Sequence, residues 1–347
     1  MSGLQLNSES SSVKRISVIG AGAFGTSLAT IAARNGHDVI LWARDEAVVS
    51  GINTNHVNNN YLSTFTLLDN ISATSDVREA LTNVDMIILA LPAQIVPDFL
   101  RENKDIIDPG TLLCNSAKGL YLKEKCLLSE AIPPAMGRDQ PYAVLSGPSF
   151  AKEMMLGHPT AVVAASKYLY HSVTIQRLLS SSTFKVFTSQ DILGVQLGGS
   201  LKNPLAIGAG IIEGKKLGIN TLAFYLTRSS IELMRLCQAM GGDPGTISGL
   251  SGIGDLMLTA FGDLSRNRSC GLRMARGESV SDITKDMTVE GIYSAKVAVS
   301  YADACGLELP IFRTVEAIID GRMTLEEAQE HLMGLPLSRE RVATRSM

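Results

Sequence analysis

The chain has 347 residues, of which 45% are hydrophobic and 19% are charged, a composition that suits two folded domains and excludes a largely disordered protein. The formal net charge of -3 provides no overall positive field, which argues against nucleic-acid binding and against recruitment to anionic membranes. An anionic small molecule would therefore have to be held by a local pocket.

The five cysteines form no C-x-x-C pair, which indicates a reducing, cytoplasmic setting. No apolar stretch approaches the ~20 residues that a membrane-spanning helix needs, so we expect no membrane-embedded segment. We expect no metal site. The serine-rich residues 1–13 are expected to form a disordered tail.

The first folded segment has the pattern strand, glycine-rich turn, helix, strand. The strands are predicted at Arg15–Ile19 and Asp38–Trp42, and the helix at 27–35. Between the first strand and the helix, residues 20–25 read G-A-G-A-F-G, a G-x-G-x-x-G sequence that is a weak signal alone. Its position after a strand and before a helix predicts a dinucleotide site, in which the glycines allow a tight turn, approach of a pyrophosphate and close helix packing.

The end of the second strand distinguishes the two nicotinamide cofactors. An acid there binds the ribose 2'-hydroxyl, whereas an arginine accommodates a 2'-phosphate. Arg44 favours NADP(H), and the adjacent Asp45 keeps NAD(H) open as the alternative.

Further apolar runs alternate with helical segments and predict more strands. These runs lie at 85–91, 111–114, 142–145, Thr160–Ala165 and 184–187. Strands that are apolar on both faces predict an α/β fold with a Rossmann-like, mostly parallel sheet that helices cover on both sides.

Two polar segments follow strands of this sheet. Lys118 comes after the strand at 111–114, at the carboxyl edge where ligands bind, and can meet a phosphate or carbonyl oxygen. The alternative for Lys118 is a solvated loop lysine. Ser149 follows the strand at 142–145 and is predicted to be the N-cap of a helix whose amides line a pocket, or part of a plain turn.

The pattern changes near residue 190, where strand signals end and long helical patterns begin. These patterns lie at 192–212, 221–240, 297–305 and 311–320. We therefore expect a dinucleotide-binding domain at 14–190 and a helical substrate and catalytic domain at 191–347. The segment 324–337 is expected to be a last helix or an interface arm.

Lys202 and Asn203 interrupt the predicted helix 192–212, which is otherwise apolar or small around them. Such a pair is costly to bury unless it faces a polar cavity, and desolvation lowers a lysine pKa by up to ~3–5 units. This pattern favours a general acid or base, while a lysine that reaches water along the helix is the alternative.

Two later segments complete the candidate site. The glycine-dense residues 248–259 predict a shaped loop near a ligand, in which Asp255 orients an ammonium or hydroxyl group. Ser265 is predicted to cap a helix whose first turn carries Arg266 and Arg268. Helix amides, the dipole and two guanidinium groups together form a phosphate site, with an exposed arginine pair as the alternative.

Seven motifs, taken in order, resemble those of the NAD(P)-dependent glycerol-3-phosphate dehydrogenases of the soluble bacterial type. They are G-A-G-A-F-G-T at 20–26, A-K-G at 117–119, S-G-P-S-F-A-K-E at 146–153, G-V-Q-L-G-G-S-L-K-N at 194–203, G-I-G-D-L at 252–256, S-R-N-R at 265–268 and V-E-G at 289–291. The resemblance implies reversible reduction of dihydroxyacetone phosphate to sn-glycerol 3-phosphate by NAD(P)H, which supplies the backbone for phospholipid synthesis. It also implies a homodimer.

The resemblance further implies roles for individual residues. Lys202 matches the catalytic acid/base, Lys118 a lysine that contacts substrate and cofactor, and Asp255 the acid near the reacting centre. The implied substrate contacts are Lys118, Gly147, Ser149, Lys202, Asn203, Asp255, Thr259, Ser265, Arg266 and Asn267. The implied cofactor contacts are Gly20, Gly22, Ala23, Phe24, Gly25, Arg44, Lys118, Ala151, Arg266, Val289 and Glu290.

Ser200 and Pro204 depart from the pattern of the family. Pro204 lacks a backbone donor and is expected to kink the helix beside Lys202. Two other functions stay open: a β-hydroxyacid or sugar-acid dehydrogenase of similar build, and a non-catalytic nucleotide sensor. The arginine-bearing turn at 265–268 argues against the first, and a lysine within an apolar helix argues against the second.

Overall fold

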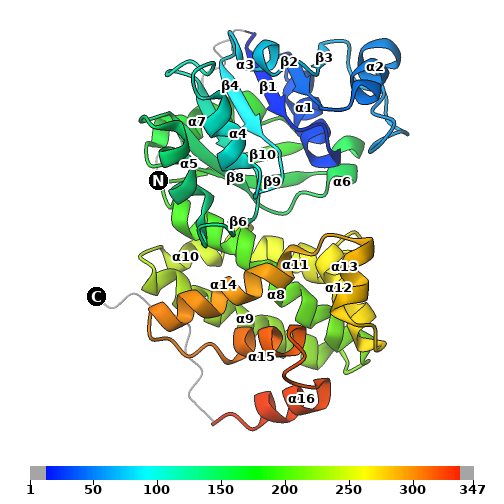
Figure 1. The fold of residues 1–347 in the computed structure, drawn as a ribbon, viewed down its shortest axis with the longest axis vertical. Helices are drawn as coiled ribbons and strands as arrows, with labels where there is room; N and C mark the ends of the chain where they lie inside the picture. Colours follow the sequence, from blue (N-terminus) through cyan, green and yellow to red (C-terminus); the bar gives the residue numbers. More distant parts are fainter. Residues whose placement is uncertain (1–12, 337–347) are drawn as a thin grey trace.

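The structure is a computed structural model that describes residues 13–336. The predicted tail at 1–13, except for Val13, and residues 337–347 lie outside the described chain. The chain first forms a sheet with its covering helices and then continues as helices alone (Figure 1). The predicted fold class is confirmed.

One eight-stranded sheet dominates the first part of the chain. Its strands are β1 (Arg15–Ile19), β2 (Asp38–Trp42), β3 (Ile71–Thr74), β4 (Met86–Leu89), β5 (Leu112–Asn115), β8 (Tyr142–Ser146), β9 (Thr160–Ala165) and β10 (Phe184–Ser189). They are ordered β10-β9-β8-β5-β4-β1-β2-β3. Every neighbouring pair is parallel except β8 with β9.

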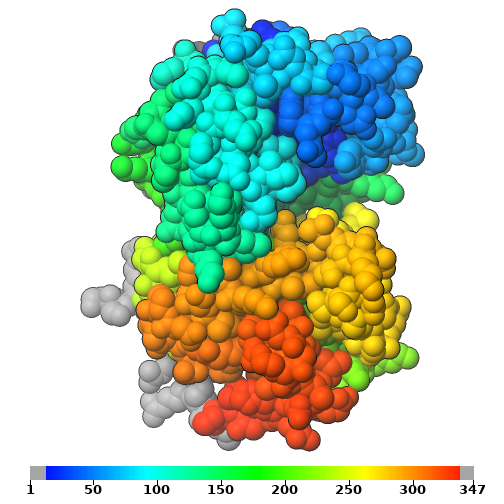
Figure 2. Space-filling model, viewed as in Figure 1, coloured from blue at the N-terminus to red at the C-terminus, as the bar shows by residue number. Residues whose placement is uncertain are grey.

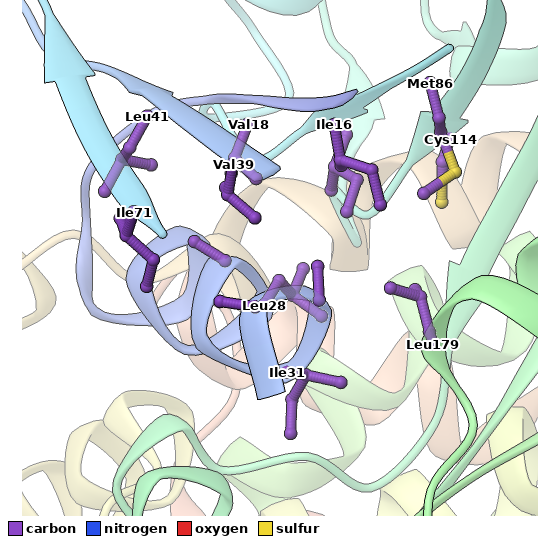
Figure 3. Close-up of a cluster of buried hydrophobic side chains, with 14 of the residues drawn as sticks. Ile16, Val18, Leu28, Ile31, Val39, Leu41, Ile71, Met86, Cys114 and Leu179 are labelled. Carbon is purple, nitrogen blue, oxygen red and sulfur yellow. The ribbon is translucent and has the colours of Figure 1, made fainter. Parts of the chain in front are cut away.

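Helices cover both faces of this sheet. They are α1 (Ala23–Arg34), α2 (Glu46–Asn55), α3 (Val77–Leu81), α4 (Val96–Asn103), α5 (Leu128–Met136), α6 (Ala151–Leu156) and α7 (Leu169–Leu179), with a hairpin of β6 (Leu120–Tyr121) and β7 (Cys126–Leu127). Leu28 and Ile31 of α1 pack toward Val18 and its neighbours on one face (Figure 3). On the other face, Ile87 belongs to a second apolar cluster. The strands are therefore apolar on both sides, as predicted.

The second part of the chain is helical. Its elements are α8 (Ile192–Gly214), α9 (Ile219–Ala239), α10 (Pro244–Ile247), the π-helical turn η1 (Leu250–Gly254), α11 (Asp255–Phe261), α12 (Arg266–Ala275), α13 (Val280–Asp286), α14 (Glu290–Ala304), α15 (Pro310–Ile319) and α16 (Leu325–Met333). Helix α16 corresponds to the last helix expected within 324–337. Because α8 is buried from Gly194 to Ile211, it forms the centre around which α9, α11, α12 and α14 pack.

Three local features differ from the sequence prediction or add to it. The glycine-dense residues 248–259 form a π-helical turn and the start of α11 instead of a loop. Helix α8 continues without interruption from Ile192 to Gly214 and includes Pro204, so the helix that carries Lys202 extends past this proline. The strand β3 lies at the edge of the sheet and was not predicted.

Candidate functional site

The glycine-rich turn lies between β1 and α1. Gly20 has φ +116°, and a Cβ on it would lie 2.7 Å from the carbonyl oxygen of Ala90. A Cβ on Gly25 would overlap the carbonyl oxygen of Gly20, so this glycine lets α1 approach the strand. At Gly22 a Cβ would meet nothing within 4 Å, which leaves open space beside the backbone. These are the three steric environments expected for a turn that receives a pyrophosphate.

Helix α1 also offers free donors to that open space. Its N-cap is Gly22, which has no side chain to accept a hydrogen bond, and the first backbone bond into the helix is donated by Thr26. The N–H groups of Ala23, Phe24 and Gly25 therefore find no backbone acceptor within residues 13–336. Unpaired amides at the positive end of a helix dipole suit a phosphate anion.

Arg44 and Asp45 follow β2, but their side chains are used differently. Asp45 caps α2 by accepting a hydrogen bond from the Ala47 amide at 2.9 Å, and its other oxygen accepts one from Asn60 Nδ2 at 3.1 Å. The exposed Arg44 has no hydrogen bond or ion pair to another described residue. The arrangement leaves the guanidinium, and not the carboxylate, available for a ligand at this strand end.

A buried carboxylate joins two lysines at the junction of the two parts of the chain. Asp255, the first residue of α11, is 0% exposed. Its Oδ2 accepts a hydrogen bond of 2.9 Å from Lys118 Nζ, and its Oδ1 forms an ion pair with Lys202 Nζ. Lys118 comes from the loop after β5, and Lys202 from the middle of α8. Three predicted catalytic residues that are far apart in the sequence thus lie together.

The two lysines differ in how their protons are used. Lys118 Nζ donates to the Gly147 carbonyl at 2.6 Å, to Asp255 at 2.9 Å and to Ser149 Oγ at 3.3 Å, which occupies all three of its protons. Among the described residues, Lys202 Nζ has Asp255 as its only ion-pair partner and forms no other hydrogen bond. Lys202 therefore has protons left for a ligand, whereas Lys118 is held in place.

Burial changes the acidity of Lys202, whose residue is 6% exposed. The pKa of Lys202 is lowered to about 8, mainly by desolvation; Asp255 and Glu290 oppose this change, and the positive charge of Lys118 adds to it. The ammonium and the neutral amine are therefore both accessible near neutral pH. A group with this property can donate or accept a proton during a reaction.

Close packing of η1 on the backbone of α8 determines where Lys202 lies relative to Asp255. A Cβ on Gly198 of α8 would lie 2.5 Å from the carbonyl oxygen of Ser251 in η1. Glycine thus lets the π-helical turn rest directly on α8, one helical turn before Lys202. Because α11 starts where η1 ends, this contact places Asp255 beside the lysine. π-Helical turns are frequent at functional sites.

Ser149 does not cap a helix, so that prediction is wrong. The N-cap of α6 is Phe150, which accepts no side-chain bond, and Ala151 is the first helical residue. The Ser149 hydroxyl instead donates to the Gly147 carbonyl at 2.9 Å and accepts from Lys118. Two acceptors therefore fix the Lys118 ammonium from the sheet side of the site.

The start of α12 forms the turn that was predicted at 265–268. Ser265 is its N-cap and accepts a hydrogen bond from the Arg268 amide at 3.2 Å. Arg268 is not available for a ligand, because its guanidinium binds Glu213 at 2.6 and 2.8 Å and Asp263 at 3.0 Å. The expected pair of guanidinium groups is therefore reduced to the exposed Arg266, which has no ion pair to a described residue.

An amide network connects this turn to α14. Asn267 Nδ2 donates to Asn203 Oδ1 at 3.0 Å, and Asn203 Nδ2 donates to Glu290 at 3.2 Å. Asn267 Oδ1 also accepts from the Gly291 amide at 2.9 Å. These four residues thus interlock beside Lys202. No sequence pattern predicts the pairing of Asn203 with Asn267.

Three further predicted residues lie near these groups. Thr259 is buried and donates to the Asp255 carbonyl at 2.6 Å, one turn along α11. Val289 is the buried N-cap of α14. The Phe24 ring lies 5.7 Å from Lys118 Nζ, which brings the glycine-rich turn beside the two lysines. Arg44 lies apart from them, beyond the end of β2. The molecular surface is hollowed between the blue N-terminal segment and the yellow helices (Figure 2).

Comparison with known proteins identifies the family. The model of the N-terminus of NAD-dependent glycerol-3-phosphate dehydrogenase matches residues 15–171, and the model of its C-terminus matches residues 191–330. The chain belongs to the NAD-dependent glycerol-3-phosphate dehydrogenase family. This result confirms the resemblance inferred from the seven motifs.

Individual relatives cover almost the whole chain. A glycerol-3-phosphate dehydrogenase [NAD(P)+] of Geobacter sulfurreducens is 39% identical over 94% of this chain and 99% of its own length. A chloroplastic glycerol-3-phosphate dehydrogenase [NAD(+)] 2 of Arabidopsis thaliana is 40% identical over 93% of this chain and 78% of its own. The crystal structure of glycerol-3-phosphate dehydrogenase from Coxiella burnetii has a TM-score of 0.86 and 34% identity, and covers 93% of this chain and 99% of that one.

Within residues 13–336 we find no cluster of three or more histidine, cysteine or acidic side chains able to hold a metal ion. Over the same residues no helix has the length and apolar character needed to cross a membrane.

Proposed function

We propose that the protein catalyses the reversible reduction of dihydroxyacetone phosphate to sn-glycerol 3-phosphate with NAD(P)H. The observation that carries the proposal is the buried group of Lys202, Asp255 and Lys118, next to a turn shaped for a dinucleotide. The product would serve as the backbone for phospholipid synthesis, as the family resemblance implies.

The residues present fit a nicotinamide dinucleotide. Gly22 and the free amides of Ala23, Phe24 and Gly25 would hold the pyrophosphate, and Gly20 shapes the turn. When bound, the reduced nicotinamide supplies the hydride. We propose Ala151, at the start of α6, and Val289 and Glu290, at the start of α14, as further contacts to the cofactor.

Lys202 is proposed as the group that moves the proton. In the reducing direction its ammonium would donate a proton to the carbonyl oxygen of the substrate, and in the oxidising direction its neutral amine would take the proton back. A pKa of about 8 makes both forms available. Asp255 orients Lys202 through the ion pair and separates it from Lys118.

Lys118 is proposed to stabilise negative charge on the same oxygen. Its contact with Ser149, at 3.3 Å, is the longest of its three hydrogen bonds and the one most readily exchanged for a substrate oxygen. Gly147 and Ser149 would then line the substrate pocket, and Thr259 supports it through the Asp255 carbonyl.

The substrate phosphate is proposed to bind at the start of α12. The N–H groups of Arg266 and Asn267 have no backbone acceptor within the described chain, and Ser265 shapes the turn. These amides, the helix dipole and the Arg266 guanidinium together suit a dianion. Arg266 would also reach the cofactor. Asn203 keeps Asn267 in place through their hydrogen bond.

We propose that NADP(H) is preferred over NAD(H). Asp45 already caps α2 and binds Asn60, while Arg44 is free to meet a 2'-phosphate. We also propose that residues 14–190 and 191–347 act as dinucleotide-binding and substrate domains. A cytoplasmic homodimer remains our proposal, supported by the lack of C-x-x-C pairs and by exposed apolar side chains such as Ile219 and Phe224 on α9.

The decisive experiment follows NADPH absorbance after dihydroxyacetone phosphate is added to the full chain. We expect NADPH oxidation that depends on both substrates, with NADH less effective at equal concentration. In a parallel assay of the oxidising direction with NADP+, a β-hydroxyacid replaces sn-glycerol 3-phosphate, and we expect it to form no NADPH. The proposal is overturned if saturating dihydroxyacetone phosphate causes no oxidation of either cofactor.

A further inference from the structure

Asn58 is a fully buried polar residue of the sheet part that no step of the proposed reaction uses. It lies in the irregular segment between α2 and β3 and is 0% exposed. Its Nδ2 donates two hydrogen bonds of 2.8 Å, one to the Ala21 carbonyl and one to Thr26 Oγ1. Both acceptors belong to the glycine-rich turn or to the first turn of α1.

The backbone of Asn58 is itself anchored. Its carbonyl accepts hydrogen bonds from the amides of Tyr61 and Leu62, and Leu62 is buried in the apolar cluster that also contains α1. Asn58 thus acts from a fixed position. Its Oδ1 is buried and has no partner within residues 13–336, so both donors of the amide are directed at the turn and its acceptor is left unused.

The contact to Ala21 determines the direction of the next amide. In a trans peptide the C=O of one residue and the N–H of the following residue point in opposite directions in one plane. Because Asn58 holds the Ala21 carbonyl toward the protein interior, the Gly22 N–H points away from it. The Gly22 N–H finds no acceptor in the described chain, and the space that a Cβ on Gly22 would occupy is also open.

We propose that Asn58 is a positioning residue for cofactor binding, which fixes the Ala21–Gly22 peptide so that its N–H faces the pyrophosphate. This inference rests on the proposed function and extends it, because it assigns cofactor affinity to a residue outside the G-x-G-x-x-G sequence. Without Asn58, only the longer hydrogen bond from Thr26 Oγ1, at 3.4 Å, still holds the Ala21 carbonyl. The peptide is then less constrained, and part of the binding free energy is spent on ordering the turn when the cofactor binds.

The chain offers a matched control in the same segment. Asn70 Nδ2 also donates two hydrogen bonds, to the carbonyls of Ala33 and His37 at 2.9 and 2.8 Å, but these lie at the opposite end of α1. Asn58→Leu and Asn70→Leu both remove two donors and keep a similar side-chain shape. Only the first frees the glycine-rich turn.

The test measures NADPH binding to the full chain by quenching of Trp42, the single tryptophan, at the end of β2. We expect Asn58→Leu to raise the Kd for NADPH about tenfold, the size of one lost buried hydrogen bond. The Kd of Asn70→Leu stays at the value of the unmodified protein. In steady-state assays, Asn58→Leu raises KM for NADPH and leaves kcat and the KM for dihydroxyacetone phosphate unchanged.

Amide hydrogen exchange of the peptide covering residues 20–24 gives an independent measure. Asn58→Leu should accelerate it and Asn70→Leu should not. Unchanged exchange and NADPH affinity in Asn58→Leu, or equal losses in both variants, overturn the inference. If Asn58→Leu does not fold, Asn58→Ala is measured in its place. Failure of the unmodified protein to oxidise NADPH counts against the proposed function, while the exchange difference still decides the role of Asn58.

Discussion

At the scale of single residues, the site depends on one carboxylate shared by two ammonium groups. Asp255 is buried and compensates the charge of Lys202, which burial alone would neutralise at a much lower pH. Removing Asp255 would lower the pKa of Lys202, since its negative charge favours the ammonium form. The pH dependence of catalysis should report this balance directly.

We expect kcat/KM to depend on pH in opposite ways in the two reaction directions. Lys202 is protonated below its pKa of about 8, so kcat/KM for reduction should fall as the pH rises through about 8, and kcat/KM for oxidation should rise. Asp255→Asn should shift both limbs to lower pH. If kcat/KM changed with pH in the same way in both directions, the titrating group would not be Lys202.

Substitution of Lys202 separates chemistry from cofactor binding. Lys202→Met keeps the length of the side chain but has no proton to transfer, so kcat should fall by about 10²- to 10⁴-fold. The Kd for NADPH should stay the same, because the glycine-rich turn does not contact this residue. Single-turnover kinetics and tryptophan quenching measure the two quantities, and a variant with near-normal kcat would exclude Lys202 as the acid.

At the scale of elements, two arginines in the same helical turn have different roles. In α12, Arg266 is free, whereas Arg268 binds Glu213 of α8 and Asp263. The sequence presents the two arginines as equivalent, because their partners lie in other segments and are brought close only by folding.

The two arginines therefore form a matched pair of variants. Arg266→Met should raise KM for dihydroxyacetone phosphate about 10- to 100-fold, through loss of a charge-assisted bond to phosphate, and leave the thermal midpoint unchanged. Arg268→Met should lower the thermal midpoint and leave that KM unchanged. Steady-state kinetics and thermal unfolding of both variants test the assignment. A raised KM in Arg268→Met together with a lowered thermal midpoint in Arg266→Met would contradict it.

Sequence patterns predicted most helices and strands, but not how these elements are arranged relative to one another. The strands β1, β2, β4 and β5 are short apolar runs between turns, and periodicity predicts them well. Strand β3 was not predicted because Ser72 and Thr74 make it polar, which is possible for a strand at the edge of a sheet. The reversed direction of β9 against β8, and the π-helical form of 250–254, depend on tertiary packing and leave no periodic signal.

In the candidate site, too, the chemistry of single residues could be predicted but their mutual contacts could not. The types and spacing of Lys118, Lys202 and Asp255 pointed to their chemistry, since buried charges are rare without a purpose. Their mutual contacts could not be derived, because each comes from a different segment. The Ser149 prediction failed by one residue, because α6 has Phe150 as its N-cap. The Ser149 hydroxyl donates to the Gly147 carbonyl and accepts from Lys118 instead of from a helix amide.

At the scale of the whole molecule, the site lies where the sheet part meets the helical part. Lys118 and Gly147 come from the sheet part, and Asp255 and Lys202 from the helices, so the Lys118–Asp255 bond crosses the junction. A ligand that contacts both parts should stabilise the complete chain rather than one portion of it.

Thermal unfolding with cofactors tests this stabilisation and the cofactor preference together. NADPH at about 100 times its Kd should add about 2.7 kcal/mol to the free energy of unfolding. For a chain of this size that corresponds to a rise of several degrees in the midpoint. Arg44→Ala should reduce the shift caused by NADPH and not the shift caused by NADH. Equal losses with both cofactors would show that Arg44 does not recognise the 2'-phosphate.

The burial of α8 has a consequence for how this enzyme can be redesigned. From Gly194 to Ile211 every side chain is enclosed, so substitutions there change the protein's ability to fold before they change its choice of substrate. The exposed start of α12 carries no such penalty at Arg266. Libraries intended to alter substrate preference should therefore randomise the rim at that turn and keep α8 constant, and deep mutational scanning should find α8 the least tolerant segment.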